Sequence, residues 1–323
     1  MFQILIMAKA KEITGIDCAA DALEWAGKVL RVRFDEVIEL RDPALDFSDI
    51  EGVHAMRVAT RRLRSALGDF LPLVKKRPLR RVRKNLKKIA DALGAVRDQD
   101  VAILALEHLQ SAAEIDQINL KIKEGIEKLL GERRRLREKA QTNLIQTLDA
   151  GGLAKLREDF TAALDKAVSS NKRARVVSFN EAGREAVDAS LRELCDLGVS
   201  VYEPFNIEKL HEMRIAAKRL RYAVELFTAC WGDSIAPFAA QIAEMQSFLG
   251  EVHDCDVWLD NLSVRLRKRQ NNAANAGERQ AAAWLLSEFI RNRTKNYRGA
   301  LKLWSEWEAN DFTERLRALI QTA

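Results

Sequence analysis

The chain has 323 residues, enough to bury a full hydrophobic core and typical of a protein with two domains. It is rich in Ala, Leu, Glu, Lys and Arg but has only 15 Gly and 5 Pro, which favours long helices and argues against a strand-rich fold. The formal net charge is +6, a moderate basic excess whose distribution is more informative than its size. The sequence contains no apolar run of the ~18 residues that a membrane-spanning helix needs.

The N-terminus and the cysteines indicate a cytosolic protein. The opening run MFQILIM is too short for the apolar core of a secretory signal. The four cysteines (Cys18, Cys195, Cys230 and Cys255) show no CxxC spacing and fall in helical patterns, which is typical of reduced, buried thiols. We therefore expect a cytoplasmic protein that holds no metal or cofactor and does not bind a membrane.

Apolar periodicity and turn residues predict an all-α fold in two halves, residues 1–157 and 158–323. A first set of helices is predicted near residues 18–41, 50–71, 74–93, 98–112, 115–149 and 153–168. A second set is predicted near residues 179–199, 207–230, 234–250, 254–270, 275–303 and 310–321. Gly94 and Gly250 are among the turn signals that separate these helices. A capping box from Ser48 to Glu51 is expected to open helix 50–71, and Asn206 is the expected cap of helix 207–230.

One segment of the first half recurs in the second half with its basic residues in the same register. Residues 53–70 read VHAMRVATRRLRSALGDF, and residues 210–227 read LHEMRIAAKRLRYAVELF. A second motif, LG-x-V-x-D-x-D-V, starts at Leu93 and again at Leu249. Each half is therefore predicted to contain a first helix, a basic helix, a return helix, a turn at the second motif and long trailing helices. In its simplest form such a half is a four-helix bundle.

A helical wheel sorts the repeated segment into a cationic face and an apolar face. The cationic face, here called the stripe, consists of His54, Arg57, Arg61 and Arg64 in the first half and of His211, Arg214, Lys218 and Arg221 in the second. The apolar face of the first copy consists of Met56, Leu63, Leu67 and Phe70. Arg62 is predicted to point away from both faces.

The next helix of the first half carries a second cationic face. Its basic arc consists of Lys76, Arg80, Arg83, Lys84 and Lys87, and its apolar arc of Leu79, Val82, Leu86 and Ile89. Between Val53 and Ala90 the chain has thirteen Lys or Arg and a single acid, Asp69. Charged helix faces are often merely solvated, but this imbalance and the repeated register favour a polyanion site. An arginine guanidinium can donate two parallel hydrogen bonds to phosphate oxygens, and a lysine ammonium adds a point charge.

The histidines and the paired aspartates leave several readings open. His54 and His211 occupy matched positions in the first turn, where the positive helix end favours a neutral ring. They are expected either to orient the stripe as neutral donors or to be purely structural, with metal ligation the weaker option.

The aspartate pairs of the second motif could cap the following helix, pair with a nearby Arg, or hold Mg²⁺. Capping and pairing are favoured. These pairs are Asp98 with Asp100 and Asp254 with Asp256.

The paired H-x-M-R-x-x-x-[RK]-R-L-R helices, each followed by the second motif, resemble the CHAD domain over nearly the whole chain. The resemblance implies two pseudo-symmetric four-helix bundles with a basic groove between them. It also implies binding of inorganic polyphosphate, association with polyphosphate granules and no catalytic activity. Carried onto this sequence, the ligands are the stripe residues of both halves together with Arg80, Arg83, Lys84 and Lys87. The counterpart segment 236–244 has no base, so the second half is expected to use Arg291, Lys295 and Arg298.

Three other functions compete with polyphosphate binding. A nucleic-acid module would explain the charge, but the basic region has one aromatic residue, Phe70, and few base-edge donors, so nucleic acid is not the expected partner. A Mg²⁺-dependent phosphohydrolase would have to use the aspartate pairs, because the chain has no P-loop and no ExExK motif. A scaffold for acidic protein partners at granules is compatible with polyphosphate binding. The prediction is a non-catalytic binding protein.

Overall fold

The computed structural model describes residues 10–11, 13–115, 120–169, 176–268 and 276–322, and these residues form α-helices without a β-strand. Their only pairing of β type is an isolated bridge between Asp21 and Ser178. The all-α prediction is confirmed. Among the described helices, none combines the length and apolar character needed to cross a membrane.

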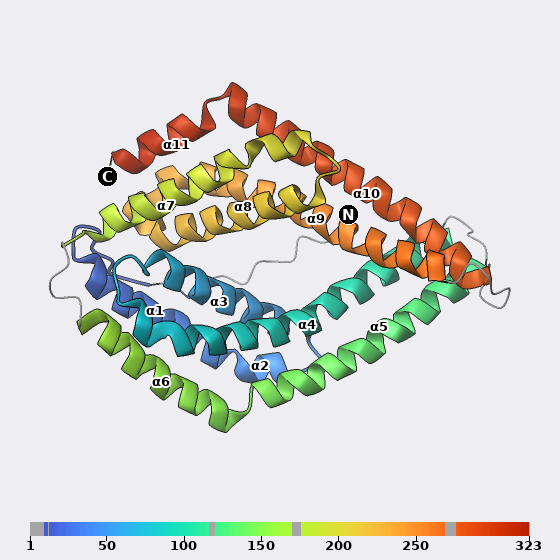
Figure 1. The fold of residues 1–323 in the computed structure, drawn as a ribbon, viewed down its shortest axis with the longest axis horizontal. Helices are drawn as coiled ribbons and strands as arrows, with labels where there is room; N and C mark the ends of the chain where they lie inside the picture. The colour runs from blue at the N-terminus through green and yellow to red at the C-terminus, as the bar shows by residue number, and fades with distance from the viewer. Residues whose placement is uncertain (1–9, 12, 116–119, 170–175, 269–275, 323) are drawn as a thin grey trace. The chain divides into compact units, whose positions relative to one another are not determined.

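The chain divides into two compact units (Figure 1). The first comprises residues 1–112 and 129–182, and the second comprises residues 113–128 and 183–323. Residues 113–128 therefore belong to the second unit, although they lie between the two segments of the first in the sequence. In chain order, the elements begin with α1 (Ala22–Glu39), α2 (Arg41–Leu45), α3 (Ile50–Asp69), α4 (Lys76–Ile115), α5 (Leu120–Thr147) and α6 (Ala150–Ser169). The elements of the second half are α7 (Phe179–Asp196), η1 (Gly198–Tyr202), α8 (Ile207–Phe227), η2 (Thr228–Cys230), η3 (Gly232–Ile235), α9 (Ala236–Lys268), α10 (Ala276–Ala309) and α11 (Phe312–Gln321).

In the first unit, α1 packs against α3 and α6. Phe34 of α1 stacks on Phe160 of α6, with 4.1 Å between the ring centroids. The predicted apolar faces of both basic helices are confirmed, because every member of the two sets is buried. These members are Met56, Leu63, Leu67 and Phe70 on α3 and Leu79, Val82, Leu86 and Ile89 on α4. The basic faces of α3 and α4 are thus carried on helices whose orientation is fixed by their buried sides.

In the second unit, α9 packs against α8 on one side and α10 on the other. The beginning of α5 lies against the start of α10. A Cβ atom built on Gly125 would be 2.5 Å from Cβ of Ala281 and 2.8 Å from the carbonyl oxygen of Gly277. Lys128 Nζ also lies 3.4 Å from Glu278 Oε1. Small residues on both helices therefore permit this close approach.

The predicted turns at Gly94 and Gly250 are wrong. α4 continues through Gly94 to Ile115, so the helices expected at 74–93 and 98–112 are one helix. α9 continues in the same way through Gly250. A lone glycine costs a helix interior only about 1 kcal/mol relative to Ala. The buried side chains Leu93 and Val96 maintain the apolar arc of α4 across this position, and their burial outweighs that cost.

The predicted helix starts are partly confirmed. Asn206 caps α8 by accepting a hydrogen bond from the backbone N–H of Lys209 at 3.2 Å. At α3, however, the cap is Asp49, which accepts from the backbone N–H of Glu51, and not the expected Ser48. The Ser48 hydroxyl donates instead to Asp46 at 2.6 Å. Each basic helix therefore has a defined start, which fixes the register of its stripe.

Candidate anion-binding site

The stripe of α3 forms a compact cationic cluster with a residue of α4. His54, Arg57 and Arg61 lie half-buried on α3, and Arg97 of α4 is 4 % exposed. Burial, followed by the charges of Arg97, Arg61 and Arg57, lowers the pKa of His54 to about 4. His54 is therefore a neutral ring among three guanidinium groups at neutral pH. This agrees with the predicted neutral state, and burial and the neighbouring cations are the main causes.

The Arg57 side chain of α3 contacts α4 beside this cluster. A Cβ atom built on Gly94 would lie 3.9 Å from Nε of Arg57, so the Arg57 side chain runs along the α4 backbone. Arg57 Nη2 is also 3.8 Å from Oδ1 of the exposed Asp98. Burial lowers the pKa of Arg97, against the attraction of Asp100 and Glu51. Three carboxylates, Asp98 and Asp100 of α4 and Glu51 of α3, therefore lie close to the three arginines of this cluster.

The second unit contains the corresponding cluster on α8 and α9. Nδ1 of His211 lies 3.1 Å from Nδ1 of His253, and the ring centroids are 4.4 Å apart. The pKa of His253 is lowered to about 4 by burial and then by Arg214, His211 and Lys218. The pKa of His211 is lowered too, first by burial and then by Arg214 and Lys218. Two nitrogens this close can share one hydrogen, so a neutral donor faces a neutral acceptor.

The two clusters extend the predicted site by one residue each. Arg97 and His253 occupy equivalent positions in the second motif, and each lies with the stripe of its own unit. Neither residue is among the ligands predicted from the sequence, because the motif is interpreted there as a turn between helices. The sequence does contain a signal for these two positions. If the helix that precedes the motif continues through it, the side chain at position 97 or 253 lies on the helix face that points toward the stripe.

The other predicted ligands of the first unit are solvent-exposed. Arg64 completes the stripe of α3. The predicted arc of α4 is exposed along its length, and among the described residues none of its members forms an ion pair. Its members are Lys76, Arg80, Arg83, Lys84 and Lys87. The basic face of this unit is therefore largely unneutralised by acids of the same unit.

The remaining predicted ligands of the second unit have different surroundings. Arg221 is 8 % exposed, and its Nη1 donates to Gln246 Oε1 at 2.9 Å, whereas its counterpart Arg64 is exposed. Arg291, Lys295 and Arg298 lie on the exposed face of α10. Arg291 pairs there with Glu288 at 3.0 Å. The structure thus brings His211, Arg214 and Lys218 together with His253.

Arg62, which is predicted to point away from both faces, is buried against α1. Arg62 is 6 % exposed, and its Nη1 lies 3.8 Å from Glu36 Oε1 of α1. Glu36 also accepts a hydrogen bond from Arg33 at 3.1 Å, and both of these groups are buried. The helical wheel could not foresee that α1 packs on this side of α3 and supplies the carboxylate. Arg62 therefore belongs to a buried charge network between two helices.

Of the three readings of the aspartate pairs, pairing with arginine is confirmed and capping is wrong. Asp100 accepts from Arg137 Nε at 2.6 Å, and Asp256 accepts from Arg293 Nε at 2.6 Å. Each arginine also donates to a backbone carbonyl before the basic helix, Phe47 at 3.5 Å and Pro204 at 2.7 Å. Because these aspartates lie inside α4 and α9, they cannot cap a helix.

Metal ligation is not supported by the described residues. No group of three His, Cys, Asp or Glu within the described ranges is arranged to hold a metal ion. The four cysteines carry free thiols, and Cys255 is buried with its pKa raised to about 12, mainly by burial. The clusters instead combine guanidinium, ammonium and neutral imidazole donors. Such a donor set binds oxyanions.

Comparisons with known proteins identify the family. A family model described as the CHAD domain matches residues 28–263. Two uncharacterized proteins from Mycobacterium tuberculosis strains are similar, at 29 % and 28 % identity over 234 residues, or 70 % of this chain. The chain spans 43 % of the length of these two proteins.

Two solved structures share the fold. The crystal structure of the CHAD domain from the plant Ricinus communis matches with a TM-score of 0.69 and 20 % identity, covering 98 % of this chain and 96 % of that one. PptA from Streptomyces chartreusis matches with a TM-score of 0.68 and 12 % identity, covering 88 % of this chain and 100 % of that one. The family match covers well over half of the sequence, and the chain therefore belongs to the CHAD domain family.

Proposed function

We propose that this protein binds linear inorganic polyphosphate without catalysing its turnover. The proposed ligands in the first unit are the stripe of α3, Arg97 and the exposed arc of α4. In the second unit they are His211, Arg214 and Lys218 with His253. The predicted ligands Arg291, Lys295 and Arg298 remain part of the proposal as an outer cationic surface on α10. Arg221 supports the stripe from a buried position.

The observation that carries the proposal is the concentration of positive charge around a neutral histidine. Three arginines lower the pKa of His54 in addition to burial, and two cations act in the same way on His253. Carboxylates such as Asp98 lie beside these cations, and a bound anion would stabilise the cluster further. A polymer of phosphates supplies such anions at many positions, and its release of counterions adds to the affinity.

The environment of the carboxylates supports a binding role over hydrolysis. Asp100 and Asp256 are each held by an arginine at 2.6 Å, so neither is available as a general base in this arrangement. We propose on this basis that the protein holds phosphates and does not cleave them.

A phosphate polymer suits the site better than nucleic acid does. Binders of single strands place aromatic side chains where bases can stack on them. Phe70, the single aromatic residue of the basic region, is fully buried in the core. Cytoplasmic location at polyphosphate granules follows from the proposed ligand, and acidic proteins at such granules could compete for the same basic faces.

A competition experiment tests this proposal. Labelled long-chain polyphosphate is bound to the protein and displaced with single-stranded DNA, RNA or unlabelled polyphosphate at equal phosphate concentration. We expect unlabelled polyphosphate to displace the label and the nucleic acids to displace little of it. Stronger displacement by nucleic acid would contradict the proposed ligand. Sustained phosphate release on addition of Mg²⁺ would contradict the non-catalytic role.

A further inference from the structure

The partner of the stripe histidine differs between the two units. In the second unit, His253 of α9 faces His211 of α8 with 3.1 Å between their Nδ1 atoms. In the first unit, the position equivalent to His253 holds Arg97, whose charge helps to lower the pKa of His54. An arginine only donates hydrogen bonds and keeps its charge at neutral pH, whereas a second imidazole can accept a hydrogen bond and can take up a proton.

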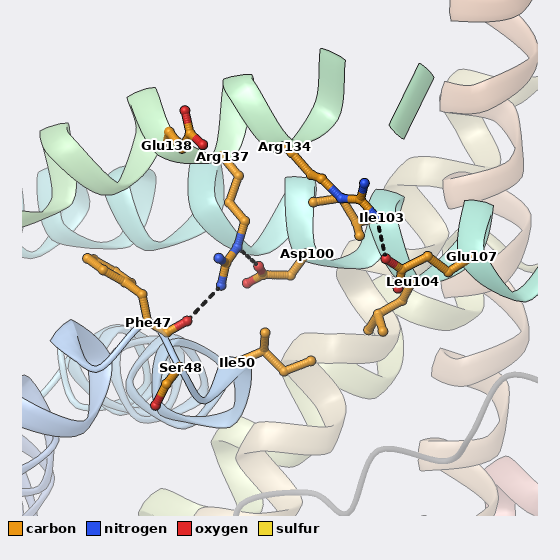
Figure 2. Close-up of a pocket in the computed structure, with 10 residues that line it drawn as sticks. All are labelled: Phe47, Ser48, Ile50, Asp100, Ile103, Leu104, Glu107, Arg134, Arg137 and Glu138. Carbon is orange, nitrogen blue, oxygen red and sulfur yellow. Dashed lines mark hydrogen bonds and ion pairs between the residues drawn. The ribbon is translucent and has the colours of Figure 1, made fainter. Parts of the chain in front are cut away.

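The helices around these two positions are held by the same ion pair in both units. Figure 2 shows the pair of the first unit, in which Arg137 of α5 donates to Asp100 of α4 at 2.6 Å. In the second unit, Arg293 of α10 donates to Asp256 of α9 at 2.6 Å. Each aspartate stands three residues, or almost one helical turn, after position 97 or 253. The exchange of arginine for histidine is therefore a change of one side chain within a framework that the two units share.

The contact between the two imidazoles determines which nitrogens remain for an anion. In a neutral pair, one Nδ1 carries the shared hydrogen and the other Nδ1 accepts it. The ring that donates through Nδ1 then has a bare Nε2, whereas the other ring carries its hydrogen on Nε2. A neutral pair therefore offers a phosphate one N–H donor and one nitrogen lone pair, which repels phosphate oxygens. Uptake of one proton at the bare Nε2 gives two Nε2–H donors and keeps the contact between the rings.

The charges around the histidine pair oppose this proton when no anion is bound. Arg214 and Lys218 of α8 act against protonation of both rings, in addition to burial, whereas Glu212 of α8 favours protonation of His211. Further charged groups on the adjoining helices are Glu251, Asp254 and Asp256 on α9 and Arg293 on α10, the last two paired with each other. A phosphate bound by Arg214 and Lys218 would add negative charge beside the rings and would therefore favour their protonated form.

We infer that the His211–His253 pair takes up a proton from solvent when the second cluster binds polyphosphate, and that the first cluster binds without one. The proton enters at the bare Nε2 and completes the set of donors that face the anion. Around His54, three guanidinium groups already supply permanent charge and N–H donors, so binding there requires no proton. Polyphosphate affinity therefore rises as the pH falls, and the second unit is the cause. This inference rests on the proposed function and adds its regulation by pH.

Calorimetric titration of the whole protein with long-chain polyphosphate, near pH 6 and in buffers of different ionisation enthalpy, counts the protons taken up. Long chains are used because few of their phosphates are terminal groups that titrate near neutral pH. We expect uptake of at least about half a proton per bound protein, which corresponds to an affinity about threefold higher for each unit of pH decrease. Binding without proton uptake would overturn this inference and leave the proposed function standing. Absence of binding would contradict the proposed function, and this inference with it.

Matched variants assign the proton to the pair. His253→Arg gives the second cluster the partner that the first cluster has, so we expect tighter binding near pH 7.5 and loss of the proton uptake. His54→Gln is the control, and it should weaken binding but keep the proton uptake. Uptake that survives in His253→Arg, or that disappears in His54→Gln, would refute the assignment. If His253→Arg does not fold, the double variant His211→Gln/His253→Gln carries the test, because it leaves no ring in this cluster to protonate.

Discussion

His211 and His253 face each other with their Nδ1 atoms 3.1 Å apart, a contact that links α8 to α9 within the cationic cluster of the second unit. In the first unit the equivalent pair is His54 and Arg97, and Arg97 contributes to lowering the pKa of His54 to about 4. Both units therefore place a neutral imidazole against a second basic side chain at the same register. The imidazoles supply N–H donors without adding positive charge, whereas Arg97 adds a cation to the cluster of the first unit.

The lowered histidine pKa values predict a loss of stability on acidification. An unfolded histidine has a pKa of about 6.5, whereas His54 and His253 in the folded protein have values of about 4. Between these two values the unfolded state binds more protons, so the free energy of unfolding falls as the pH falls from about 6.5 to 4. Since both rings are only half-buried, we expect about 1 kcal/mol from each. Denaturant melts of the protein and of His54→Gln across this range measure the effect, and an equal pH slope in the two would contradict it.

The stripe of α3 should contribute strongly to polyphosphate affinity. Replacing Arg57, Arg61 and Arg64 together by Ala is expected to weaken binding by several kcal/mol, at roughly 1.5–3 kcal/mol for each charge-assisted hydrogen bond. The matched control replaces the exposed bases Arg135, Lys139 and Lys155 of α5 and α6, which changes the net charge equally. Fluorescence anisotropy with labelled polyphosphate compares the two. Equal weakening would show that only the overall charge matters.

Arg62 should contribute to stability more than to binding. Its guanidinium is buried beside Glu36, and removal of one partner from a buried ion pair typically costs about 3–5 kcal/mol. We therefore expect Arg62→Ala to lower the free energy of unfolding by about 3 kcal/mol while polyphosphate affinity of the folded protein changes little. A double-mutant cycle with Glu36→Gln isolates the pair. A variant that is fully stable but binds poorly would contradict this assignment.

The contact between α5 and α10 should be intolerant of side chains larger than hydrogen at Gly125. A Cβ atom there would lie 2.5 Å from Ala281 and 2.8 Å from a backbone oxygen, so Gly125→Ala should cost about 1–3 kcal/mol through overpacking. Gly131 lies on the same helix with no neighbour within 4 Å of an added Cβ. Gly131→Ala should therefore stabilise the protein by about 0.5–1 kcal/mol. Thermal melts distinguish the two, and a shared sign would contradict the packing.

Much of the fold follows from local periodicity. The apolar faces containing Met56 and Leu86 could be predicted because burial of one helix face leaves a period of 3.6 residues in the sequence. The continuity of α4 and α9 could not, since Gly94 and Gly250 are weak helix residues whose cost is outweighed by burial of their neighbours. A prediction from helix propensity alone ends a helix at each of these glycines and therefore divides both α4 and α9 in two.

In the site, too, some features follow from the sequence of one helix, whereas others depend on how the helices pack against one another. The register of His54 and Arg57 follows from one helix, and the repeat shows that it occurs twice. The places of Arg97 and Arg62 depend on which face of α3 contacts α4 and which contacts α1. That choice is made by packing between segments distant in the sequence, so a single-helix wheel does not contain it.

The most direct test of the account is a binding titration of the purified protein with long-chain polyphosphate at low and at physiological salt, with orthophosphate as the control. The account predicts tight binding whose affinity falls steeply with salt, because each neutralised phosphate releases counterions, and no measurable binding of orthophosphate. Absence of polyphosphate binding at low salt would contradict the proposed function, and the clusters around His54 and His253 would then serve a different anion.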